Sequence, residues 1–508
     1  MMYDAVVVGG GIGGLTSAAI LAKEGKKVLL LEQFARVGGY ATAWKREGIT
    51  VEGVLHEIDD IGVGSQKANL LRGLRIYDKL EFVAPKEFHR VIADGIDMTV
   101  PHGYENIKKF FADNFPHEKE GLDIFFSGID AIYDEVTELS SIKGIGVAKL
   151  LLFPLFFKSL IKYDKKSYGE FLDECIKDER LKLLISANLG YYTDNPYNLG
   201  LLFFAMAQGS YYRGGGYFVK GGSQLFSDAF ADSIRQNGGE IITRAEAVKI
   251  ETRGGKATGV VYRQIGAQKI PDKRAVAKVV INNASPSWAI NALDDKDSVP
   301  QKKYTDFTKS QISPSCFGIY ALIKGERAPN NRPYSTHVFT PYSGLGDVSH
   351  GIYAPFEKRP FAIADYGAID SGLSNGKDLR LVAIFATDRY DDWANLDEVI
   401  YEERKKEVAE TLLKRAAEIY PDILESIHSY EAATPITMER YTKNPKGAIY
   451  GFMQTSTQSG RYRKKFASIL PNILNASAWG EIGGGYSGAM YGGEFAAKKA
   501  LKLLGETK

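Results

Sequence analysis

Three glycines and one acid near the start of the sequence set the first chemical prediction. The apolar run Tyr3–Val8 leads into Gly9, Gly11 and Gly14, and the next apolar run ends in Glu32. Gly9 allows a tight turn, Gly11 lets a pyrophosphate approach the backbone, and Gly14 lets the following helix pack closely on the strand. The positive helix N-terminus would hold the phosphates, and a carboxylate at Glu32 would accept hydrogen bonds from a ribose. The pattern predicts a dinucleotide-binding βαβ unit.

A second glycine pair decides which dinucleotide is expected. Arg36, Gly38, Gly39 and Thr42 follow the acid within ten residues. Backbone at the glycine pair would approach the same pyrophosphate from its other side, and the arginine offers a fork of donors that suits phosphate. Because an NAD enzyme has little use for such a loop, the segment favours FAD. The alternative is a glycine turn with a solvated arginine.

A third glycine segment lies near the end of the sequence, from Glu481 to Gly488. Its spacing formally matches a dinucleotide fingerprint, but no following strand and acid complete the unit. We expect instead the glycine-lined N-terminus of a helix, Ala489–Leu504, facing the flavin end of the same FAD, where amides and helix dipole stabilise a reduced ring. The alternative is a glycine turn that only caps this helix.

Composition limits the remaining possibilities. The chain has 508 residues, 44% of them hydrophobic, so it can bury a large core and form two or three domains. Dispersed charges with a net charge of +2 give no case for nucleic-acid binding. The two cysteines, Cys175 and Cys316, predict no disulfide scaffold and no metal site. Because Asp4 interrupts any signal-peptide core, we expect a cytoplasmic protein.

The expected fold class is α/β, with a Rossmann-like FAD/NAD(P)-binding domain of the glutathione-reductase or amine-oxidase type and a discontinuous α+β substrate domain. We assign residues 1–68, 214–286 and 445–508 to the FAD-binding domain, 69–213 to a mostly helical, substrate- and membrane-facing subdomain, and 287–444 to an α+β substrate domain. The predicted strands are Tyr3–Val8, Lys27–Leu31, Glu240–Ile242, Ala247–Glu251, Thr258–Arg263, Val276–Ile281, Ser315–Lys324, Phe361–Tyr366, Leu379–Thr387 and Asn472–Trp479, and the principal predicted helices are Glu170–Lys177, one from Ser223 to about Gln236, Leu396–Tyr420 and Ala489–Leu504.

One segment, Val147–Tyr163, has two interpretations of equal weight. Its apolar core, Leu150–Phe157, is too short to span a bilayer and contains Pro154. Five lysines flank it, at positions 149, 158, 162, 165 and 166, which suits a segment lying in a membrane interface. The other interpretation is a buried core helix kinked at its proline.

Taken together, the motifs resemble those of the flavoprotein group that holds phytoene desaturases, carotenoid isomerases and retinol saturases. The resemblance runs nearly end to end through GGGIGGL and Glu32, RVGGYATAW, EGVLHEID, YFVKGGSQLFSDAF, AVKIETRGGKATGV, VVINNASP and WGEIGGGYSGAMYGGEFAA. It implies that FAD is held by Gly9, Gly11, Gly14, Glu32, Arg36, Gly38, Gly39 and Thr42, by backbone at Val248, and by the segment around Glu481, Gly488 and Ala489.

The resemblance also implies an activity. Enzymes of that group desaturate, saturate or isomerise carbon–carbon bonds of long apolar polyenes, and they are commonly associated with membranes. The sequence departs from the desaturases at Trp479–Ile482, where they tend to carry a threonine and a proline before the glycines. The His56-Glu57 pair is closer to the saturase-like branch. Polyene length and reaction direction stay open.

The expected mechanism is hydride transfer at flavin N5 to or from an apolar, isoprenoid-like substrate held in a dry channel. Tyr191, Tyr192, Phe203, Phe204, Tyr211, Tyr212, Tyr217 and Phe218 could line such a channel, but we favour ordinary core packing for most of them. His56 is the one candidate for proton handling, and a structural role would explain it equally well.

Two other functions stay open at this stage. One is a flavin amine oxidase, and the other is a non-enzymatic prenyl or lipid carrier on the same fold, as in the Rab GDP-dissociation inhibitors. We find no second complete fingerprint for a nicotinamide cofactor, so the electron donor or acceptor is not assigned.

Overall fold

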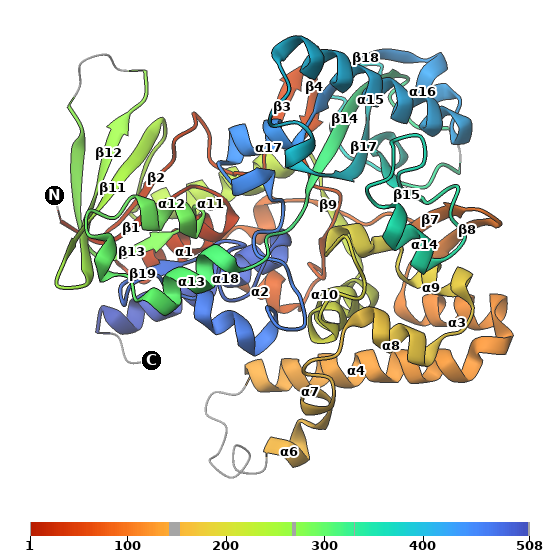
Figure 1. Ribbon diagram of the computed structural model, residues 1–508. Coiled ribbons are helices and arrows are strands. Elements are labelled where there is room, and N and C mark those ends of the chain that lie inside the picture. The colour runs from red at the N-terminus through yellow and green to blue at the C-terminus, as the bar shows by residue number, and fades with distance from the viewer. Residues whose placement is uncertain (1, 142–152, 267–270, 330, 506–508) are drawn as a thin grey trace.

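The computed structural model describes residues 2–141, 153–266, 271–329 and 331–505, which form two large sheets and a helical region (Figure 1). The spatial strand order of the first sheet is β10 (Glu240–Ile242), β2 (Val28–Leu31), β1 (Met2–Val8), β13 (Lys273–Asn282), β12 (Lys256–Gln264) and β11 (Ala245–Arg253), with β19 (Ile473–Asn475) paired to β13. β1 is parallel to β2 and to β13. The carboxyl ends of these strands therefore share one edge, which brings Gly9, Glu32 and Asn283 together.

Three helices cover one face of this sheet: α1 (Ile12–Lys23), α11 (Ser223–Gln236) and α18 (Gly485–Leu503). Their apolar side chains share one core with β1 and β2, whose residues are buried on both faces and nearly all apolar. Over the other face lie α12 (Pro286–Asn291) and α13 (Gln301–Lys309). The first and last long helices of the chain thus pack on one sheet.

Helices α1 and α18 approach each other through glycines. A Cβ at Gly13 would lie 2.0 Å from the carbonyl oxygen of Ala476, and a Cβ at Gly493 would lie 2.3 Å from that of Gly13. Only glycine lets the two backbones come this close. The contact packs the middle of α18 against the start of α1.

The second sheet is mainly antiparallel. Its order is β18 (Ile427–Ala433), β14 (Ser315–Lys324), β17 (Leu379–Asp388), β16 (Phe361–Asp365), β15 (Ser335–Val338), β7 (Glu87–Ala93) and β8 (Ile96–Pro101). Helices α15 (Glu398–Ile419) and α16 (Asp422–Glu425) pack over it.

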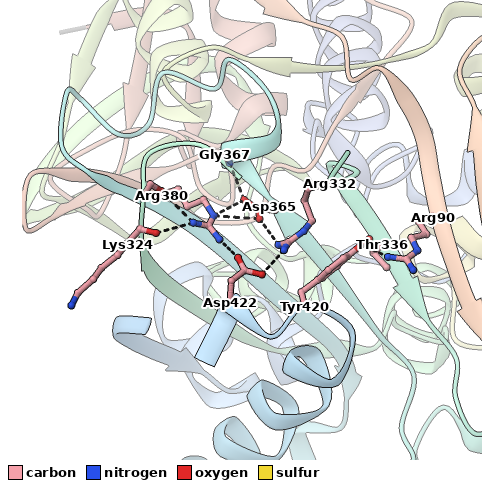
Figure 2. A network of polar contacts seen from close by, with 10 residues as sticks. Arg90, Lys324, Arg332, Thr336, Asp365, Gly367, Arg380, Tyr420 and Asp422 are labelled. Atoms are coloured by element: carbon pink, nitrogen blue, oxygen red, sulfur yellow. Dashed lines mark hydrogen bonds and ion pairs between the residues drawn. The ribbon is translucent and has the colours of Figure 1, made fainter. Parts of the chain in front are cut away.

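A buried ion network ties this sheet to α16 (Figure 2). Arg332 donates to Asp365 at 2.9 Å, and the Nε of Arg380 lies 3.3 Å from the same carboxylate. Both arginines also pair with Asp422. The side chains of Arg332, Asp365 and Arg380 are at most 5% exposed, so each charge depends on its partners.

The helical region lies at the lower right of Figure 1 and has its own aromatic-rich core. Its helices are α3 (Tyr104–Asn114), α4 (Lys119–Ser141), α6 (Phe153–Phe156), α7 (Lys158–Lys162), α8 (Tyr168–Cys175), α9 (Glu179–Ile185) and α10 (Leu201–Gly214). The shorter elements elsewhere are β3 (Ala43–Arg46), β4 (Ile49–Glu52), β5 (Ile58–Asp59), β6 (Phe82–Val83), β9 (Gly216–Val219), α2 (Gln66–Gly73), α14 (Leu345–Gly351) and α17 (Pro435–Thr442), besides short 3₁₀ turns. Among the described helices, none combines the length and the apolar character that crossing a bilayer requires.

The α/β fold class is confirmed, while several predicted boundaries are wrong. The final helix begins at Gly485 rather than Ala489, because the glycines themselves form its first turn. Only Ile473–Asn475 of the predicted strand Asn472–Trp479 pairs with the sheet. The proposed subdomain 69–213 also contains β7 and β8, and β7 pairs with β15 of the second sheet. The domain division itself stays a proposal.

Candidate active site

The first glycine loop and Glu32 form one hydrogen-bonded unit. Gly9 has a φ of +96°, which favours glycine, and it starts the turn between β1 and α1. The Glu32 carboxylate accepts from the backbone N–H of Gly10 at 2.7 Å and of Phe34 at 2.8 Å. Burial raises the pKa of Glu32, and these N–H groups oppose the rise by stabilising the charged form. The carboxylate is thus held rigidly beside the loop.

The second glycine pair lies directly on the first loop. The N–H of Gly38 donates to the Gly10 carbonyl at 2.7 Å, and a Cβ at Gly39 would lie 3.3 Å from the Cα of Gly11. Arg36 is exposed, and the half-buried Thr42 donates to Gln224 at 2.9 Å.

The cavity-lining residues separate the predicted cofactor residues into two groups. Eight of them line the cavity: Gly9, Gly11, Glu32, Gly38, Gly39, Glu481, Gly488 and Ala489. Four do not, among the residues that the structure describes: Gly14, Arg36, Thr42 and Val248. Gly14 has a packing role instead, because a Cβ there would lie 2.2 Å from the Gly9 carbonyl. At Val248 the β11–β12 register shifts, so its backbone lies at an irregularity in the ladder.

The N-terminus of α18 completes this group. Gly484, Gly485 and Ser487 also line the cavity, so the amides of the first turn lie at its wall. A Cβ at Gly484 would lie 2.7 Å from the backbone of Tyr450, which explains why this close approach needs glycine. Glu481, the departure from the desaturase pattern, pairs with Lys499.

These elements fit the cofactor predicted from the sequence. A dinucleotide needs glycine backbone and a helix N-terminus at its phosphates and a carboxylate at its ribose, and all three share one cavity wall. The cavity has a volume of about 1450 Å³. Pockets for one small ligand take about 300–1,000 Å³, so this one has room for a second guest beside the cofactor.

The cavity continues from the glycine loops into an aromatic region. Of the eight candidate aromatics, Tyr191, Tyr192, Phe203 and Tyr211 line it. Phe204, Tyr212, Tyr217 and Phe218 are not among the lining residues; all but the half-buried Tyr217 are in the core. Beyond the aromatics the cavity reaches Val136 on α4, Phe153 on α6 and Ile161 on α7.

His56 lies in the aromatic part of the cavity. Its Nδ1 is 3.4 Å from the Tyr191 hydroxyl, and its ring centroid is 5.0 Å from that of Phe385. Within the described chain, its buried Nε2 has no hydrogen-bond partner. Burial lowers the pKa of His56 to about 4, so the imidazole is neutral at neutral pH. It can accept a proton only weakly.

Two groups of cavity residues were given no role by the sequence analysis: Glu57, and Asp59 with its partners. Burial raises the pKa of Glu57, which follows His56, to about 8. Asp59 pairs with Lys67, is contacted by Ser210, and accepts from the Ser487 hydroxyl at 2.5 Å. Burial disfavours charge on Asp59, but these partners hold its pKa below the usual value. The sequence feature that could have pointed to these residues is the group of acids in the segment EGVLHEID.

Replacing Glu32 by alanine is expected to weaken FAD retention at least about tenfold, because a charge-assisted hydrogen bond is worth about 1.5–3 kcal/mol. The measurement is the flavin absorbance per chain after dialysis. Glu246→Ala, an exposed acid at the same end of the cavity, serves as the matched control. Equal retention by Glu32→Ala and wild type would contradict the assignment.

Replacing Ser487 by alanine is expected to lower the free energy of unfolding by about 1.5–3 kcal/mol, because the half-buried Asp59 carboxylate loses a donor. Urea titration followed by tryptophan fluorescence measures the change. Ser487→Thr keeps the hydroxyl and should recover most of the loss. A change below about 0.5 kcal/mol in Ser487→Ala would show that this contact is not stabilising.

Comparison with known proteins agrees with this geometry. The family model described as flavin containing amine oxidoreductase matches residues 12–501. Prolycopene isomerase of Daucus carota is 28% identical over 90% of this chain and 73% of its own length. All-trans-retinol 13,14-reductase of Danio rerio is 25% identical over 88% of this chain and 77% of its own. The resemblance inferred from the motifs is confirmed.

Two solved structures share the fold. Putrescine oxidase bound to putrescine superposes with a TM-score of 0.64 at 16% identity, and the match covers 100% of both chains. Cyclohexylamine oxidase from Brevibacterium oxydans gives a TM-score of 0.61 at 17% identity over 99% of both chains.

Proposed function

Because this chain belongs to the flavin-containing amine oxidoreductase family and is an FAD-dependent oxidoreductase, we propose that it desaturates, saturates or isomerises carbon–carbon bonds of a long apolar polyene. The relatives that act on prolycopene and on all-trans-retinol support an isoprenoid-like substrate.

One observation carries the proposal: a single cavity extends from the N-terminus of α18, past aromatic side chains, to α7 near the surface. A long apolar molecule entering beside α7 would have its far end next to the glycine turn of α18. The aromatic walls exclude water and align the chain by contact, since such a substrate offers few groups for hydrogen bonding.

The chain's own residues have separate tasks in this arrangement. Glu32 and the two glycine loops would hold the nucleotide part of FAD, and the α18 amides would stabilise negative charge at its reactive end. When bound, FAD supplies hydride acceptance or donation. The Asp59–Lys67 pair holds the start of α18 through Ser487.

The polar groups near the aromatic region do not favour an amine substrate. An ion pair with a protonated amine would need an unpaired carboxylate there. Asp59 is already paired with Lys67, and burial favours the neutral form of Glu57.

The test is conversion by the FAD-loaded protein under anaerobic conditions. We expect the protein to convert prolycopene or all-trans-retinol to a new isomer or to a saturated or desaturated product, which chromatography detects. Bleaching of the flavin by either polyene would also show reaction. Putrescine and cyclohexylamine should not reduce the flavin. Reduction by an amine and no change in either polyene would contradict the proposal.

We also propose a membrane contact at the cavity entrance. Of the segment singled out by sequence, 147–152 lie outside the described residues. In the described part, Leu155, Phe156 and Ile161 are 62%, 45% and 49% exposed, so this part is not a buried core helix. Exposed lysines at positions 158, 162 and 165 surround them. This surface would suit an anionic inner membrane face, with the protein peripheral and cytoplasmic.

Replacing Leu155, Phe156 and Ile161 together by serine is expected to lower binding to anionic phospholipid vesicles about tenfold or more, because exposed apolar area is lost. Cosedimentation measures it. Val399→Ser with Ile400→Ser, on α15, removes exposed apolar side chains elsewhere and should leave binding unchanged. Equal binding by the triple variant would contradict a contact at this site.

A further inference from the structure

The Glu57 carboxyl lies in the cavity, but none of the tasks assigned above to the cavity residues uses it. It lines the cavity wall beside His56, directly before β5. A Cβ at Gly216 on the neighbouring β9 would lie 2.2 Å from its Oε2, so the carboxyl lies directly over glycine backbone. This contact leaves no room for a side chain at position 216 and fixes where the acid stands.

The surroundings of Glu57 differ from those of the other acids already described. Glu32 accepts hydrogen bonds from two backbone N–H groups, and Asp59 accepts from the Lys67 ammonium and from two hydroxyls. In the described parts of the chain, no group donates a hydrogen bond to the Glu57 carboxyl, and burial alone accounts for its raised pKa of about 8. This shift favours the protonated acid at neutral pH, and the carboxyl faces the cavity.

Given the proposed polyene substrate, on which this step rests, we infer that Glu57 is the proton donor to the substrate: its carboxyl protonates one carbon of the conjugated chain and takes a proton back after the weakened bond has rotated. Glu57 thus contacts the reacting atoms, and the result is geometric isomerisation.

The step balances without a co-reactant. The O–H bond of Glu57 breaks, and the π electron pair of one double bond forms the new C–H bond. The positive charge left behind spreads over the conjugated chain, and the former double bond rotates as a single bond. Return of a proton from that carbon to the carboxylate restores the double bond in its new geometry. Nothing is oxidised or reduced overall.

The walls around Glu57 suit a delocalised cation. Tyr191, Tyr211 and Phe385 line the same part of the cavity, and Tyr191 and Phe385 both lie against His56. Aromatic faces attract positive charge, and the Glu57 carboxylate formed in the step adds an opposite charge. Exclusion of water protects the cation from capture.

The test uses the FAD-loaded protein with prolycopene in D₂O. We expect the wild-type product to carry deuterium on chain carbons. Glu57→Gln should keep its FAD and bind prolycopene. Its deuterium incorporation should fall at least about 100-fold, because a positioned general acid typically contributes that much to a reaction rate. Asp60→Asn changes a neighbouring acid whose φ of +46° asparagine adopts readily, and it should retain the label.

A second readout does not depend on turnover. Infrared spectra of the resting protein at neutral pH should show a protonated-carboxyl band in wild type that is lost in Glu57→Gln. If Glu57→Gln loses FAD, the test uses Glu57→Asp instead. In that variant the protonated-carboxyl band should shift, and deuterium incorporation should fall.

The possible failures are distinguishable. Isomerisation without deuterium in the product, or wild-type labelling by Glu57→Gln, overturns the role of Glu57 and leaves the polyene activity standing. A missing infrared band overturns it too. Failure of wild type to change any polyene overturns both the proposed function and this step.

Discussion

Gly13→Ala should leave a protein with at most about one tenth of the wild-type FAD content and a lower unfolding temperature. The added Cβ would lie 2.0 Å from the Ala476 carbonyl oxygen and 2.8 Å from the carbonyl carbon of the same residue. Both are backbone atoms at the end of β19, so no side chain can move aside. α1 has to shift away from the end of β19, which moves its N-terminus out of the position expected for binding the cofactor phosphates.

Gly346→Ala is the matched control for this variant. Gly346 lies in α14, where a Cβ would meet nothing within 4 Å, so alanine should be neutral or slightly stabilising. The measurements are flavin absorbance per chain and thermal unfolding. Wild-type FAD content in Gly13→Ala would contradict the close approach of α1 to the end of β19.

Asp365→Ala should cost about 3–5 kcal/mol of unfolding free energy, because it leaves two buried arginines sharing one remaining carboxylate. The residue stands at the end of β16, between Arg332 and Arg380 (Figure 2). Its loss leaves their positive charges close together and away from water. Urea unfolding of the purified protein measures the change.

Asp97→Ala provides the control for the ion network. Asp97 pairs with Arg90 at 2.7 Å, but its side chain is 59% exposed, so the pair is worth at most about 1 kcal/mol. If Asp365→Ala costs no more than Asp97→Ala, the buried network does not stabilise the second sheet.

The parts of the site that sequence could predict are local in the chain. The Gly9–Gly14 turn and Glu32 follow from a strand–turn–helix pattern within some thirty residues. The second sheet was only partly predicted, because β7 pairs with β15, more than 200 residues further along. Such pairing leaves no local pattern.

The groups inside the cavity could not be predicted for the same reason. Asp59 and Ser487 are 428 positions apart and meet only because α18 returns to the first sheet. Glu57 is chemically unusual only because burial removes water and donors from its carboxyl. Sequence shows that an acid is present, whereas its charge state depends on the folded surroundings.

The most direct test of the whole account is a crystal structure of the protein with FAD and an apolar polyene. We expect one FAD whose ribose contacts Glu32, whose flavin ring lies at the N-terminus of α18, and whose open face meets the polyene beside His56 and Glu57. A flavin ring far from α18, or a polyene bound outside this cavity, would contradict it.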